Sequence, residues 1–150
     1  MMNIEVQVDI NGSKEDIWKV ISDIEDSTNT ISGIEKIEVL EKPTDGIVGL
    51  KWQETRTLFG KTATEIMWIT DAKENQSYKT RAESHGAVYV TKLEIAEENE
   101  KTRLMINFEG IPQTFGAKVM SALTGGIFRK ATEKALMQDL IDIKAKVENK

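Results

Sequence analysis

IFRKATEKALMQDLIDIKAKV, residues 127–147, is the stretch that decides the fold, because it predicts a long amphipathic helix near the end of the chain. Four apolar residues recur in it at spacings of four, three and four. On a helix with about 3.6 residues per turn, these spacings place them in one stripe. They are Leu136, Leu140, Ile143 and Val147. A helix with one apolar stripe has to bury that stripe against another element.

The residues just before this stretch limit its extension toward the N-terminus. They are Leu123, Thr124, Gly125 and Gly126. Glycine is a poor helix former and is common at kinks, so we expect the glycine pair to kink or interrupt any longer helix. Almost everything upstream has the pattern of strands, which indicates that the helix packs against a sheet.

The first residues of the chain predict a strand followed by a short helix. Apolar and polar residues alternate from Ile4 to Ile10, as in a half-buried strand. Asn11-Gly12 ends this strand. Ser13 is a good N-cap residue, and the apolar residues from Ile17 to Ile24 then fit an amphipathic helix. The polar stretch 27–33 is irregular or forms a second short helix.

The middle of the chain returns to a period of two and is divided by short turns. The expected strands are Ile34–Val39, Val48–Thr57, Thr62–Thr70, Tyr78–Ser84, Val88–Ile95 and Leu104–Phe108, with Gly110 and Pro112 ending the last. Consecutive strands with short connections indicate an antiparallel meander. The order of one strand, one or two helices, six strands and a long helix therefore predicts an α+β fold.

Length and composition exclude several classes of protein. The 150 residues suit one domain, residues 1–150. The net charge of −5 and the scattered basic residues argue against a nucleic-acid partner. The absence of cysteine excludes disulfides and thiol catalysis. Because no apolar run approaches membrane-spanning length and the N-terminus lacks a signal-peptide pattern, we expect a cytoplasmic protein without a membrane span.

Three segments together carry a resemblance to a known superfamily. They are Ser13–Asp23 (SKEDIWKVISD), Gly46-x-x-Gly49-x-x-Trp52, and Asp139-Leu140-x-x-Ile143-Lys144-x-x-x-Glu148. With these segments the whole chain resembles the helix-grip fold of the START-like, SRPBCC superfamily, which includes birch-pollen-allergen, polyketide cyclase/dehydrase-like and lipid-transfer branches. The resemblance implies a curved antiparallel sheet of about seven strands wrapped around the long C-terminal helix, with an internal apolar cavity. Since the superfamily contains carriers, sensors and enzymes, it does not fix an activity.

The turn at Phe59-Gly60 decides which residues face that cavity. The strand before it places Leu50, Trp52, Glu54 and Arg56 on one face. A turn of two or four residues pairs Trp52 with Met67 and Glu54 with Glu65. A three-residue turn would instead turn Thr64, Ile66 and Trp68 inward. The superfamily pattern, which has apolar residues at the positions of Met67 and Ile69, favours the first register.

Charged residues occupy this face where the core of a sheet is usually apolar. Glu54, Arg56 and Glu65 must pair with one another, contact water in a cavity, or bind a polar group of a ligand, because an unpaired buried charge is costly. One interpretation is a structural ion pair. The other is that Arg56 orients an acidic or carbonyl group of an apolar ligand. Two adjacent carboxylates can also share a proton and act as an acid.

His85 and Tyr89 are the remaining polar candidates. His85, the only histidine, lies in Ser84-His85-Gly86, which is typical of a turn. Tyr89 either donates a hydrogen bond into the cavity or is a core aromatic residue whose hydroxyl reaches the rim. One histidine and no cysteine exclude the usual zinc sites, and the sequence contains neither a P-loop nor a nucleophile elbow. We therefore predict no metal and no cofactor.

These features predict a protein that binds a small, mostly apolar molecule, resembling a lipid, a polyketide or an isoprenoid, between the sheet and the last helix. The apolar walls would be Trp52, Met67, Tyr89, Met120, Leu123 and Phe128. The polar end would be Glu54, Arg56 and Glu65. We expect a monomer or a homodimer.

Two other functions fit the same pattern. A polyketide cyclase or aromatase would use Glu54 or Glu65 as acid and base, with Arg56 on a developing oxyanion. A protein-interaction module with a collapsed pocket would show an exposed patch around Trp68.

Overall fold

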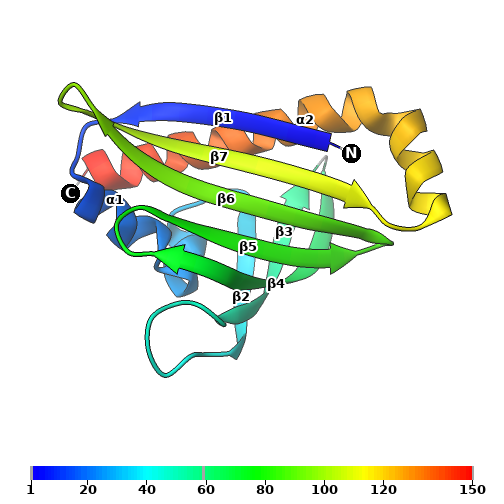
Figure 1. Cartoon of the computed structure of the whole chain (residues 1–150), viewed down its shortest axis with the longest axis horizontal. Coiled ribbons are helices and arrows are strands. Elements are labelled where there is room, and N and C mark those ends of the chain that lie inside the picture. Colours follow the sequence, from blue (N-terminus) through cyan, green and yellow to red (C-terminus); the bar gives the residue numbers. More distant parts are fainter. Residues whose placement is uncertain (1, 59, 150) are drawn as a thin grey trace.

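The computed structural model in Figure 1 describes residues 2–58 and 60–149, with the side chains of residues 58 and 120–125 left outside the description. The strands are β1 (Met2–Ile10), β2 (Ile34–Glu41), β3 (Lys51–Leu58), β4 (Lys61–Lys73), β5 (Ser77–Ser84), β6 (Ala87–Glu98) and β7 (Lys101–Pro112). The helices are α1 (Lys14–Ile21), the 3₁₀ helix η1 (Ile24–Asn29) and α2 (Phe115–Glu148).

The strands form one curved sheet in the order β1-β7-β6-β5-β4-β3-β2. Every pair of neighbouring strands is antiparallel. The N-terminal strand β1 pairs with β7, so the strand that starts the chain lies beside the strand that leads into α2. Figure 1 shows that the sheet curves around α2. The predicted α+β helix-grip fold is confirmed.

The register between β3 and β4 is the one that the superfamily pattern favours. Trp52 is opposite Met67 and Glu54 is opposite Glu65, and the pairing continues to Leu58 opposite Lys61. Gly60 has a φ of 73°, a conformation that a two-residue hairpin turn requires and glycine adopts readily. Trp52 is buried, with 2% of its surface exposed. The prediction that Trp52 is shielded, with Met67 as its cross-strand neighbour, is confirmed.

The core lies between the concave face of the sheet, α1 and the C-terminal half of α2. Its largest fully buried side chains are Ile4, Ile17, Ile69, Leu104 and Leu140. The predicted stripe of α2 takes part as expected, because Leu140, Ile143 and Val147 are buried and Leu136 packs against them. Burying each of these side chains contributes about 1.5–3 kcal/mol. The stripe is thus what holds α2 against the sheet.

Helix α1 is fixed at both ends by hydrogen bonds. The Ser13 hydroxyl accepts from the backbone N–H of Asp16 at 3.1 Å, which is the predicted N-cap. The buried Tyr78 hydroxyl of β5 donates to the carbonyl of Ile21, the last residue of α1, at 3.1 Å. The ring of Tyr78 also meets the ring of Trp18 edge-on, with centroids 6.1 Å apart. These contacts fix α1 against β5 and β6.

Three predicted boundaries differ from the structure. Helix α2 begins at Phe115 and continues through Gly125-Gly126, so of the two expected outcomes, a kink or an interruption, the interruption does not occur; glycine weakens a helix without removing a hydrogen-bond donor. Its first turns lie at an angle to the rest (Figure 1). Strand β7 continues past Gly110 to Pro112, since Gly110 stays paired with Tyr89 and Met2. Strand β3 begins at Lys51, after the left-handed Gly49.

The start of α2 is held by the turn between β5 and β6. The carbonyl of Gly86 accepts hydrogen bonds from the backbone N–H groups of Gln113 at 2.7 Å and Thr114 at 3.2 Å. Thr114 is the N-cap of α2, and its hydroxyl accepts from the N–H of Ala117 at 3.1 Å. A Cβ at Gly86 would lie 2.5 Å from that hydroxyl oxygen. The turn and the helix start therefore tolerate only glycine there.

We expect Gly86→Ala to destabilise the protein by about 2–3 kcal/mol, because it combines left-handed strain with disturbance of the N-cap. Gly46→Ala is the matched control, since Gly46 also has a positive φ but no atom lies within 4 Å of the place that a Cβ would take there. It should lose only about 1–2 kcal/mol. Urea unfolding measures both, and equal losses would show that the contact with Thr114 contributes nothing.

Candidate functional site

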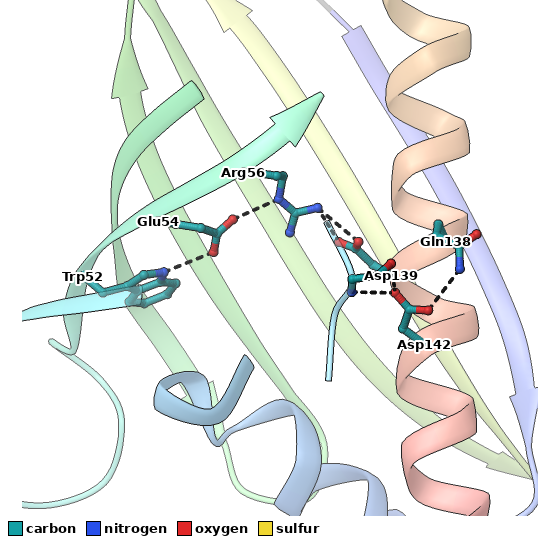
Figure 2. Close-up of polar contacts among 7 residues, drawn as sticks. Trp52, Glu54, Arg56, Gln138, Asp139 and Asp142 are labelled. Carbon is teal, nitrogen blue, oxygen red and sulfur yellow. Dashed lines mark hydrogen bonds and ion pairs between the residues drawn. The ribbon is translucent and has the colours of Figure 1, made fainter. Parts of the chain in front are cut away.

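A buried network of charged groups joins strand β3 to helix α2 (Figure 2). The Arg56 Nε donates to Glu54 Oε2 at 3.1 Å, and its Nη1 donates to both carboxylate oxygens of Asp139 at 3.0 Å. The indole N–H of Trp52 donates to Glu54 Oε1 at 3.2 Å. We call Trp52, Glu54, Arg56 and Asp139 the Arg56 network. It occupies the concave face beside the core.

The Arg56 network holds two carboxylates but one guanidinium, and all three are shielded. Their side chains are 20% (Arg56), 13% (Glu54) and 10% (Asp139) exposed. Burial raises the pKa of Asp139 to about 6, although Arg56 lowers it, because the nearby charges of Glu54 and Asp142 add to the effect of burial. Burial alone would lower the pKa of Arg56, but Asp139 and Glu54 raise it above its ordinary value. Arg56 therefore stays cationic.

A second set of contacts ties α2 to the segment before β2. The backbone N–H and the hydroxyl of Ser32 donate to Asp142 Oδ2 at 2.9 and 2.8 Å. Gln138 Nε2 donates to Asp142 Oδ1 at 3.0 Å (Figure 2). Burial raises the pKa of Asp142, but these hydrogen bonds outweigh it and lower the pKa below its usual value. Asp142 is thus a charged anchor one turn from Asp139.

Asp139 was not predicted from the sequence as the partner of Arg56. The signal was present, because Asp139 lies three residues after Leu136 and four before Ile143, inside the apolar stripe. An acid on the buried face of a helix needs a cation or a hydrogen-bond donor. Among the charged residues predicted to face the cavity, Arg56 was the one cation.

Beyond the Arg56 network, toward the β5–β6 turn, lies a second polar set, Glu65, Ser84, His85 and Tyr89, which we call the Glu65 group. Glu65 is half-buried and accepts a hydrogen bond from the Ser84 side chain. Burial raises the pKa of Glu65, and so does the charge of Glu54, while His85 and Ser84 lower it; the net shift is upward. Burial, together with Glu65, raises the pKa of Tyr89.

The turn at His85-Gly86 explains how this group is assembled. Both residues have positive φ, 50° and 75°, as a tight two-residue hairpin between Ser84 and Ala87 requires. His85 is exposed in this turn, as predicted from the sequence. The pairing of β4 with β5, with Met67 opposite Ala82, leads on to Glu65 and Ser84, and the short turn leaves Tyr89 two residues into β6.

The apolar residues predicted as walls are distributed over one row of the sheet and over α2. Trp52, Met67, Ala82, Tyr89 and Gly110 follow one another across five strands. The Tyr89 ring stacks on Phe108, with centroids 5.7 Å apart and planes inclined by 23°. Phe128 of α2 is 39% exposed. The side chains of Met120 and Leu123 lie outside the described residues.

Comparison with known proteins places the chain in a family. Residues 1–148 match a family described as polyketide cyclase / dehydrase and lipid transport. The chain belongs to this family. The resemblance to the START-like, SRPBCC superfamily stated from the sequence is confirmed, and no curated protein matches the sequence.

Solved structures of low sequence identity share the fold of this family member. TTHA0849 from Thermus thermophilus is 13% identical with a TM-score of 0.82, covering 99% of this chain and 98% of that protein. The Zhui aromatase/cyclase from Streptomyces sp. R1128 is 14% identical with a TM-score of 0.82, covering 99% and 94%. A START superfamily protein from Mycobacterium smegmatis is 17% identical with a TM-score of 0.80, covering 98% and 97%. At these identities the likeness concerns the fold alone.

The residues that the structure describes contain neither a cluster of metal-ligating side chains nor a helix that could span a membrane. These residues contain no group of three His, Asp or Glu side chains placed to hold a metal ion. None of the helices in that part of the chain is long and apolar enough to cross a membrane.

The Arg56 network generates a prediction about stability. Arg56→Ala leaves two buried carboxylates without their cation, so we expect the variant to lose about 3–5 kcal/mol in free energy of unfolding. Arg81→Ala is the matched control, because Arg81 forms an ion pair with Glu83 on the exposed surface. That pair should contribute at most about 1 kcal/mol. Similar losses in urea unfolding would contradict a special role for Arg56.

The raised pKa of Asp139 makes stability depend on pH between its ordinary value of 3.8 and about 6. In this range the folded protein retains a proton that the unfolded chain has lost, so the free energy of unfolding falls as pH rises. The stabilisation is complete below the lower value and is lost above the upper one, amounting to ~3 kcal/mol.

Asp139→Asn removes this titration and keeps the side chain uncharged. We therefore expect its free energy of unfolding to exceed that of the wild type increasingly as pH rises through this window. Urea unfolding at a series of pH values measures the difference in free energy of unfolding between the two proteins. The titration of the other carboxylates contributes equally to both proteins and cancels in this difference. Parallel profiles for the two proteins would mean that Asp139 is ionised throughout.

Proposed function

We propose that this protein binds a small, mostly apolar ligand, resembling a lipid, a polyketide or an isoprenoid, between the concave face of the sheet and the N-terminal half of α2. The observation that carries the proposal is the uneven burial of α2. Among the α2 side chains that the structure describes, the buried ones begin at Asp139. Upstream, Phe115 and Ile127 are 82% and 80% exposed. A helix that keeps apolar side chains exposed above a concave sheet suits an apolar ligand.

The sheet residues opposite this part of the fold support the same proposal. Met67 and Tyr89 are half-buried and continue the row that starts at the buried Trp52. In the proposed site they form the wall on the sheet side, and Phe128, Met120 and Leu123 form the wall on the helix side. Glu65 supplies a polar group at one end, while Glu54 and Arg56 border it.

Binding is preferred over catalysis because of how Arg56 is used. Its Nε and Nη1 are engaged by Glu54 and Asp139, so the cation that a cyclase would direct at an oxyanion is already neutralised. A cyclase or aromatase is the second candidate, favoured by the family description and by the half-buried carboxyl of Glu65, whose pKa is raised. The interaction-module alternative has less support, since Trp68 is half-buried and the Lys51 ammonium lies 5.8 Å from its ring centroid.

Two measurements test the binding proposal. Native mass spectrometry of freshly purified protein should detect a retained small molecule. The neutral fluorophore N-phenyl-1-naphthylamine should bind to the wild type and bind at least about tenfold more weakly to Met67→Trp, whose larger side chain fills the proposed site.

Ile66→Trp provides the control for the larger side chain. Ile66 directly precedes Met67 on β4 and points to the opposite face, where it is 43% exposed. It should bind the fluorophore as the wild type does. A wild-type protein that retains no molecule and binds no fluorophore would refute the proposed function.

A further inference from the structure

We infer that Glu65 selects the ligand by its head group: the proposed site accepts an apolar molecule whose polar end donates a hydrogen bond, as an alcohol or an amine does, and rejects a carboxylate. The inference rests on the proposed function and assigns a chemical class to its ligand. It also reverses the interpretation from the sequence that Arg56 orients an acidic group.

The balance of charge on the concave face is the first step. Three carboxylates face inward there, those of Glu54, Asp139 and Glu65, against the single guanidinium of Arg56. Arg56 bonds to Glu54 and Asp139 and so bridges two anions. Among the described residues, no lysine or arginine forms an ion pair with Glu65. The inner face therefore carries an excess of negative charge near Glu65.

The position of Glu65 is the second step. Glu65, Met67 and the fully buried Ile69 occupy every second position of β4 and therefore lie on the same face of the sheet. The Glu65 side chain thus leaves the sheet on the concave face. An apolar chain that lies against Met67 and Tyr89 would bring its end to this carboxylate. Glu65, opposite Glu54, lies in the row of concave-face residues next to the row that contains Trp52 and Met67, so a hydrogen-bond acceptor borders the apolar row.

The hydrogen-bonding capacity of Glu65 is the third step. An ionised carboxylate accepts through two oxygens and about four lone-pair positions, and it donates nothing. The hydroxyl of Ser84 satisfies one of these positions. The His85 imidazole lowers the pKa of Glu65 but lies exposed in the turn, and the Tyr89 hydroxyl carries no charge to offset the anion. A ligand hydroxyl or ammonium would fill a remaining position.

The same geometry disfavours an anionic ligand. A ligand carboxylate at this place would bring a second negative charge beside Glu65, with Glu54 opposite, in a half-buried setting where charges interact more strongly than in water. One of the carboxylates would have to take up a proton, as happens when two acids share a site. An ester avoids the repulsion but offers no donor, so it should bind with intermediate affinity.

The test uses four probes with the same alkyl chain: decylamine, 1-decanol, methyl decanoate and decanoate, each below the concentration at which it forms micelles. Each competes with N-phenyl-1-naphthylamine for the wild-type protein at neutral pH. We expect the amine and the alcohol to bind at least about tenfold more tightly than decanoate, the factor expected for one hydrogen bond to a charged group. The methyl ester should lie between them.

Glu65→Gln assigns the selectivity to one residue, because it keeps the shape of the side chain and removes its charge. The ratio between decylamine and decanoate should fall to within about threefold in this variant. Glu74→Gln is the matched control, since Glu74 lies exposed in the β4–β5 turn and its replacement changes the net charge equally. It should keep the wild-type ratio.

The outcomes separate the inference from the proposed function. Binding of all four probes with decanoate equal to or tighter than decylamine would overturn the inference and leave the binding function standing. A wild-type ratio that persists in a folded Glu65→Gln would overturn the role of Glu65. If this variant does not fold, the wild-type comparison of the four probes still decides. Failure of every probe, together with failure of the fluorophore, would overturn both proposals.

Discussion

The fold depends on a single cation that neutralises two carboxylates shielded from water. Arg56 of the sheet bonds to Glu54 on its own strand and to Asp139 on the last helix. Removing water from three charges is costly, and Arg56 offsets part of this cost for the two carboxylates that it bridges. The position of α2 over the sheet is therefore specified by a charge pair as well as by the apolar contacts of Leu140 and Ile143.

This arrangement divides the concave face into two regions with different properties. Around Trp52 and Tyr78 the face is packed and its polar atoms are bonded to protein groups. Around Glu65 and Tyr89 the face is half-buried, and the N-terminal half of α2 leaves the apolar side chains of Phe115 and Ile127 exposed. A region whose polar groups are all hydrogen-bonded, next to a less tightly packed one, suits a fold that keeps its shape while it binds and releases the proposed ligand.

The sequence predicted the parts of the fold that depend on local patterns. The stripe of α2, the N-cap Ser13 and the register of Trp52 with Met67 follow from periodicity, capping chemistry and family resemblance. The partner of Arg56 could not be found in that way, because Asp139 lies 83 residues later and only the tertiary fold brings the two together. Continuity of α2 through Gly125-Gly126 likewise depends on the backbone hydrogen bonds of the whole helix outweighing a local preference.

The attachment of α2 has a mechanical consequence. Its first residue is held through Thr114 and the carbonyl of Gly86, and its far end through Glu148, whose carboxylate accepts from the backbone N–H of Asn11 at 2.8 Å. From Leu136 onward it is also fixed by the core. Because both of its ends are attached, α2 cannot pivot away from the sheet about one end. Room for a larger ligand would therefore come from bending of the helix between Thr114 and Leu136, while both ends stay in place.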